Sequence, residues 1–153
     1  MSADRQAMEA RRRRLVEGVV ARYGIDEAMI ERLVHAFYAR VRADPSLGPI
    51  FATRVTDWDA HLARMCAFWS SVTLLSGRYH GQPMAAHLPL PVGPRHFARW
   101  LEIFDATARE ICPPETAAYF SERAHRVAAS LEAGIVGQAG RSQPILEAEV
   151  GSR

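Results

Sequence analysis

Residues 26–44 read DEAMIERLVHAFYARVRAD, and the spacing of the apolar residues within them decides the fold class. Apolar side chains recur at positions i, i+3, i+4, i+7, i+8 and i+11, which are Ile30, Leu33, Val34, Phe37, Tyr38 and Val41. This spacing places all six on one face of an α-helix. Asp26 can cap the first turn, and Asp44 before Pro45 favours an end to the helix there. The stretch therefore predicts an amphipathic helix with one face in a core.

Three further segments show the same helical period, and none alternates with the period of two that is typical of a strand. They cover residues 56–75, 94–112 and 114–134. Thr56 or Asp57 can cap the first of them, and Gly77 can stop it. Between this segment and the next, glycines and prolines leave room for only one or two helical turns, around residues 83–88. We therefore expect an all-α fold.

Length and charge narrow the function classes. A chain of 153 residues can form one domain with a core large enough for a small-molecule or cofactor pocket. A net charge of +2 is far from the strongly basic field of a dedicated nucleic-acid binder. The start of the chain lacks the apolar stretch of a secretory signal, and no run is long enough for a membrane span. We expect a cytoplasmic protein in which Cys66 and Cys112 serve as small apolar residues.

The domain is expected to occupy residues 26–137. Before it, residues 1–25 form an extension that contains the run Arg11 to Arg14 and a possible short helix near residues 15–23. After it, residues 138–153 are poor in large apolar groups, so we expect a disordered tail. The positive charge belongs to the first extension, which carries six arginines against three acidic residues.

Four polar side chains interrupt the apolar segments. Tyr38, His61 and Trp100 lie on the apolar faces of three predicted helices, and His87 lies in the short insert. One such group is often satisfied within a core, but four on separate segments would need four separate buried partners. A shared cavity with a bound polar guest satisfies all of them. The apolar residues expected around it are Phe37, Phe51, Met65, Phe68 and Leu88.

Familiar catalytic motifs are missing from the sequence. It has no glycine-rich phosphate loop, no His-Glu-x-x-His zinc helix and no Gly-x-Ser-x-Gly elbow. Carboxylates are scarce on the apolar faces, which argues against a di-iron carboxylate bundle. Haem suits the pattern, because the porphyrin supplies four nitrogen ligands and one neutral histidine suffices as the fifth.

At this point the sequence resembles a known family, the group III truncated haemoglobins. The resemblance rests on an ordered set of short stretches: residues 37–38, 44–51, Trp58 with His61, residues 68–69, 77–83, 87–88 and 100–101. It implies a two-over-two helical globin fold around haem b. Carried over residue by residue, His87 matches the proximal iron ligand, and Tyr38, His61 and Trp100 match the distal pocket.

The resemblance also places the apolar wall of the haem pocket. Phe51 matches an aromatic residue that packs on the porphyrin, and Phe37, Leu62, Met65 and Phe68 would complete the wall with Leu88. Arg64 could reach a haem propionate from the mouth of the pocket, and its competing interpretation is a solvated side chain. His96 is the rival to His87 as iron ligand, but its place directly after Pro94 and Arg95 favours a role at the start of a helix.

The implied function is binding of dioxygen and other diatomic ligands, NO and CO. The Tyr38 hydroxyl and the Trp100 N–H, as two interior hydrogen-bond donors, predict slow release of oxygen. Turnover of the kind seen in a nitric oxide dioxygenase or a peroxidase is an open expectation. It would need a separate reductase, because the chain has no flavin or nicotinamide fingerprint.

A haem-free helical interaction module is the alternative. The run Arg11 to Arg14 would then contact nucleic acid or an acidic surface, although four arginines in a terminus are more often solvated, so nucleic acid is not the expected partner.

Overall fold

The structure, a computed structural model, describes residues 2–81 and 92–152, with side chains as far as residue 134. All regular structure in these residues is helical. The helices are α1 (Ser2–Tyr23), α2 (Glu27–Ala43), α3 (Gly48–Arg54), α4 (Trp58–Leu74), α6 (Pro94–Ile111) and α7 (Pro114–Ser152). The expected all-α fold is confirmed.

Helix α2 forms as its sequence pattern predicts. The Asp26 carboxylate accepts a hydrogen bond from the Met29 backbone N–H at 2.8 Å, and the six residues of the apolar face are all buried. Asp44 ends the helix in an extended conformation. Asp57 caps α4 in the same way, through the Ala60 N–H.

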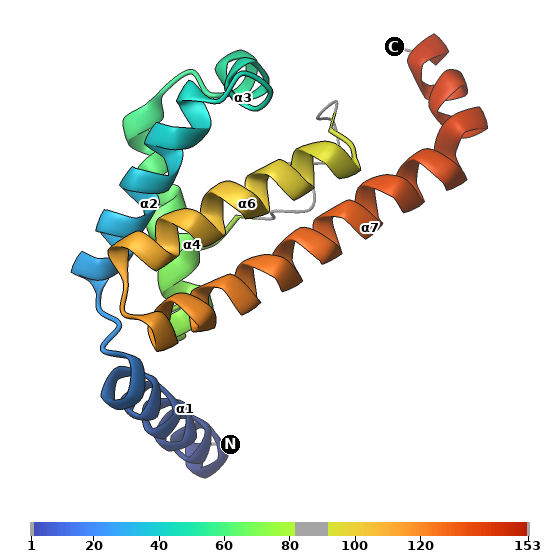
Figure 1. Cartoon of the computed structure of the whole chain (residues 1–153). Helices are drawn as coiled ribbons and strands as arrows, with labels where there is room; N and C mark the ends of the chain where they lie inside the picture. The colour runs from blue at the N-terminus through green and yellow to red at the C-terminus, as the bar shows by residue number, and fades with distance from the viewer. Residues whose placement is uncertain (1, 82–91, 153) are drawn as a thin grey trace.

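The helices pack as two pairs, α2 with α4 and α6 with α7, around an aromatic core. α2 packs against α4 and α6, and α6 packs along α7 (Figure 1). Phe37, Phe104 and Phe120 are fully buried where these helices meet. The Trp69 ring stacks on Phe104 with centroids 5.1 Å apart and meets Phe120 edge-on at 6.1 Å. This core connects α4, α6 and α7, and Trp69 also lines the cavity described below.

The N-terminal segment differs from our expectation. Instead of a short helix near residues 15–23, α1 has 22 residues, extends from the body of the molecule and buries none of its residues (Figure 1). The sequence of α1 shows no apolar helical face, because arginines occur on several sides of the helix. Ile25, which we assigned to the extension, is fully buried, and the Tyr23 carbonyl accepts a hydrogen bond from Thr116. The packed domain therefore begins before residue 26.

The other differences lie at the ends of helices. The backbone of α7 continues as a helix to Ser152, through the tail that we expected to be disordered. Helix α4 is followed directly by Leu75, which adopts a left-handed conformation, and Gly77 lies in the same turn. Helix α3 was not among the predicted helices, because it has too few residues to show a helical period.

Two smaller expectations can also be compared with the structure. Cys112 is buried and Cys66 is half-buried, in agreement with their expected role as small apolar residues. No helix in the described part of the chain has the length and apolar character needed to cross a bilayer.

Candidate functional site

A cavity of about 220 Å³ lies between the end of α2 and helices α3, α4, α6 and α7. Seven residues predicted for the site line it, namely Tyr38, Phe51, His61, Arg64, Met65, Phe68 and Trp100. Segments from across the sequence thus meet as the shared-cavity hypothesis requires. His96, which the sequence named only as the rival iron ligand, also lines it. The sequence did not predict the other lining residues, which are Leu47, Ile50, Trp69, Tyr79, Val92, Phe97, Val127, Ala128 and Leu131.

Tyr38 and His61 form one polar corner of the cavity. Their rings meet edge-to-face with centroids 5.0 Å apart, Tyr38 from α2 and His61 from α4. Burial raises the pKa of the Tyr38 phenol well above its ordinary value, and the neighbouring Tyr79 raises it further. Tyr38 therefore stays protonated at any physiological pH, and its hydroxyl remains a hydrogen-bond donor.

An aromatic cluster fixes this corner. Phe51 lies 5.9 Å from Tyr38 and stacks on Trp58 at 6.4 Å, and Trp58 meets His61 edge-on at 5.4 Å. The Arg42 guanidinium lies 4.4 Å from the centroid of the Trp58 ring. Since these rings come from α2, α3 and α4, the positions of the Tyr38 and His61 side chains depend on all three helices.

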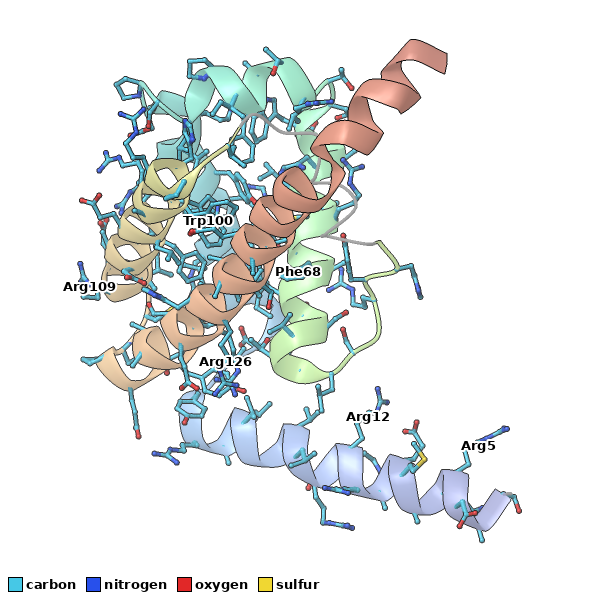
Figure 2. The ribbon with its side chains drawn as sticks, turned by 90° about the vertical axis from the view of Figure 1, so that its right-hand side faces the viewer. Arg5, Arg12, Phe68, Trp100, Arg109 and Arg126 are labelled. Carbon is cyan, nitrogen blue, oxygen red and sulfur yellow. The ribbon has the colours of Figure 1, made fainter. Side chains whose placement is uncertain are left out.

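Trp100 forms the wall of the cavity on α6. Its ring stacks on Phe104 at 5.6 Å and meets Phe37 edge-on at 5.1 Å. In Figure 2, Trp100 and Phe68 both lie in the interior, among α4, α6 and α7. The indole is half-buried and lines the cavity, and its N–H is a hydrogen-bond donor.

Two residues predicted for the apolar wall do not line the cavity. Phe37 is fully buried, with its ring against Tyr38, Trp100 and Phe104. Leu62 is half-buried and packs against the main core. Phe37 supports the lining residues Tyr38 and Trp100 from behind. A helical face specifies burial and does not specify which neighbour a side chain meets.

The rim of the cavity is more polar. Arg64 is exposed and lines the cavity, where its charge partly counteracts the increase in the pKa of Tyr79 that burial causes. His96 also lines the cavity, and its Nδ1 accepts a hydrogen bond from the Gly93 N–H at 2.9 Å. His96 thus has the expected helix-start role while facing the cavity. His87 and Leu88 lie outside the described residues.

An ion pair with a buried carboxylate attaches α6 to the α2–α3 corner. The Asp44 carboxylate accepts a 2.7 Å hydrogen bond from Arg99 Nε, and its other oxygen accepts bonds from Ser46 and Leu47. Burial alone would raise the pKa of this carboxyl, but the hydrogen bonds outweigh burial and lower the pKa to about 2. The pair connects the segment carrying Leu47 and Phe51 to the helix carrying Trp100.

The unpredicted lining residues had different sequence signals. Phe97, Val127 and Ala128 lie on helical faces that we assigned to the core. Tyr79 belongs to the stretch 77–83 that supports the family resemblance, but no role was predicted for it. Which of these residues would face a cavity depends on the relative placement of helices, which spacing along one helix does not contain.

Comparisons of the sequence with known proteins identify a family. The family model for the bacterial-like globins matches residues 21–132. The group 3 truncated hemoglobin of Campylobacter jejuni is 34% identical over 113 residues, which cover 71% of this chain and 89% of that protein. A group 2 truncated hemoglobin of Bacillus subtilis is 33% identical over 79 residues, 50% of this chain and 60% of that protein.

The fold agrees as well. The crystal structure of the group III truncated hemoglobin from Campylobacter jejuni superimposes with a TM-score of 0.67 at 34% identity, covering 71% of this chain and 89% of that one. The family match starts at residue 21, consistent with the burial of Ile25. The chain therefore belongs to the bacterial-like globin family, as a truncated globin of the group III type.

Proposed function

We propose that this chain binds haem b in the cavity and, with it, dioxygen and other small diatomic gases such as NO and CO. One observation carries the proposal: a mainly apolar cavity gathers Tyr38, His61 and Trp100 from three helices of a globin fold. Support also comes from the relatives, which are named hemoglobins. When bound, haem supplies an iron atom with an open coordination position for a gas molecule.

The residues of the cavity suit such a guest. Phe51, Met65 and Phe68 offer apolar contact to a flat macrocycle, with Leu88 as a further expected contact. Arg64 at the rim offers a cation to the carboxylates of the guest. His87 is the residue that would ligate the haem iron, and His96 is its rival.

The distal residues would act by holding donors in fixed places. The Tyr38 hydroxyl keeps its proton because burial raises the phenol's pKa, and the aromatic cluster restricts its ring. The Trp100 N–H comes from the opposite helix, fixed by stacking on Phe104. A hydrogen bond to a group that carries charge contributes about 1.5 to 3 kcal/mol, and each 1.4 kcal/mol changes an equilibrium about tenfold. Two such donors favour slow release of bound oxygen.

Slow release suits chemistry or sensing better than oxygen delivery. Reaction with nitric oxide, peroxidase-like turnover and ligand sensing remain the candidate uses. The first of these would need a separate reductase to return the iron to its ferrous state. Stopped-flow mixing of the oxygenated protein with NO, and in parallel with hydrogen peroxide, separates them: rapid nitrate formation indicates the first and rapid peroxide consumption the second.

Absorbance spectroscopy tests the haem proposal directly. Protein reconstituted with hemin should show a strong Soret band, which His87→Ala should abolish or shift and His96→Ala should preserve. Retention of the wild-type spectrum in His87→Ala with its loss in His96→Ala would instead identify His96 as the ligand. No uptake of hemin by the wild-type protein would overturn the proposal and favour the haem-free interaction module.

A further inference from the structure

The turn that follows α4 contains two left-handed residues. Leu75 has φ of 52° and Gly77 has φ of 70°. Glycine adopts this conformation freely, but for leucine it is unfavourable, so other contacts must hold the turn in place. Those contacts come from three different helices.

A closed circuit of hydrogen bonds starts and ends at Arg78. Its backbone N–H donates to Ser76 Oγ at 3.4 Å, Ser76 Oγ lies 2.7 Å from Ser70 Oγ, and Ser70 Oγ donates to Glu27 Oε2 at 2.7 Å. The Arg78 guanidinium then donates to Glu27 Oε1 at 2.6 Å. Because a carboxylate only accepts, the direction is fixed: Ser76 donates to Ser70, and each hydroxyl donates once and accepts once.

The circuit is partly buried and joins distant parts of the chain. Ser70 is fully buried on α4, and Glu27 lies in the first turn of α2. Arg12 of α1 adds a 2.5 Å bond to the Leu75 carbonyl. Linked hydrogen bonds strengthen one another where water is excluded, as around Ser70, whereas the Arg78–Glu27 ion pair that closes the circuit is about half exposed.

The turn places Tyr79 in the wall of the cavity. The Tyr79 N–H donates to Ser71 Oγ at 2.9 Å, and its ring meets Phe68 edge-on at 5.3 Å. Tyr79 lines the cavity beside Phe68, near Arg64. A side chain at Gly81 would collide with the Tyr79 hydroxyl, so the chain folds closely around this ring.

We propose that Glu27, Ser70, Ser76 and Arg78 form a positioning clamp that fixes Tyr79 in the cavity wall and slows the escape of the guest. The clamp residues do not line the cavity, so they act through Tyr79. The retention part of this inference rests on the proposed haem function, whereas the positioning part does not.

Hydrogen exchange of the haem-free protein tests the positioning part. Arg78→Ala should speed exchange of the backbone amides of residues 76–81 about tenfold or more, while α6 keeps its protection. Arg78→Lys keeps a cation for Glu27 and should restore most of the protection. The matched control is Arg126→Ala, which breaks an exposed ion pair with Glu122 on α7. Equal exchange at residues 76–81 in Arg78→Ala and the control would overturn the clamp.

Haem loss tests the retention part. After reconstitution with hemin, transfer to excess apomyoglobin should be about tenfold faster in Arg78→Ala and near wild-type in Arg78→Lys and Arg126→Ala. In a Tyr79→Ala background, Arg78→Ala should have no further effect, because the clamp acts through that ring. Additive effects would show that Arg78 acts through general stability and would overturn the positioning role.

The two proposals fail in different ways. If the wild-type protein takes up no hemin, the haem function and the retention part fall together, and the exchange measurement still decides the clamp. If hemin binds but haem loss is unchanged in Arg78→Ala, the haem function stands and the retention part is wrong.

Discussion

Replacement of Asp44 is the most informative test of the ion pair that attaches α6 to the α2–α3 corner beside the cavity. Its carboxylate accepts four hydrogen bonds, three at one oxygen from Ser46 and Leu47 and one at the other from Arg99. In Asp44→Asn the amide oxygen can keep the turn contacts, but the amide NH₂ then faces the Arg99 guanidinium. The loss of this charge-assisted bond should cost about 2 kcal/mol of unfolding free energy.

Asp44→Ala removes the turn contacts as well, so the cost should rise to on the order of 4 kcal/mol. Urea unfolding of the haem-free protein at pH 7, followed by circular dichroism, gives both values. A double-mutant cycle with Arg99→Met isolates the pair: Asp44→Asn should cost far less once Arg99 is absent.

The pH dependence gives an independent check. The pKa of Asp44 is about 2 in the folded protein against an ordinary value of 3.8, so ionised Asp44 stabilises the fold above the ordinary value. This contribution is lost as the pH falls from near 4 through about 2. The difference in stability between wild-type and Asp44→Asn should therefore be constant above pH 5 and shrink below pH 4. A difference below about 0.5 kcal/mol at pH 7, the level of an ordinary surface substitution, would refute the reasoning.

Two other predictions concern the distal donors and the N-terminus. Tyr38→Phe and Trp100→Phe should each speed oxygen release about tenfold or more in the reconstituted protein, by stopped-flow; unchanged off-rates in both would exclude them as donors to the gas. Deletion of residues 1–11 should leave the urea midpoint unchanged, because these residues bury nothing. Deletion of residues 1–25 should cost about 2 to 5 kcal/mol, since it removes the fully buried Ile25, and equal midpoints for the two truncations would contradict a packed domain that begins before residue 26.

The sequence predicted best where local chemistry and packing agree. The buried face of α2 and its Asp26 cap follow from spacing and from one carboxylate, so both were correct. Helix α1 has no apolar face, and its length could not be inferred from a pattern of burial. The left-handed Leu75 was also missed, because the contacts that hold it come from residues far away along the chain.

In the candidate site, too, features set by the local sequence were predicted, and features set by contacts between distant segments were not. The sequence placed Tyr38, His61 and Trp100 on buried faces, and the structure brings all three to one cavity. Phe37 has an equally apolar position but lies behind the wall, and Tyr79 reaches the wall from a turn. Burial is a property of one helix, whereas lining a cavity depends on how several helices cross.

The three tryptophans of the chain all lie around this one cavity. Trp69 and Trp100 line it, and Trp58 packs on Phe51 and His61 at its corner. Intrinsic fluorescence is therefore a site-specific probe in this protein without any label. A guest that absorbs in the near ultraviolet and visible range should quench the emission of all three indoles by energy transfer. Titration with hemin can then be followed by emission, while circular dichroism reports the helices as a whole.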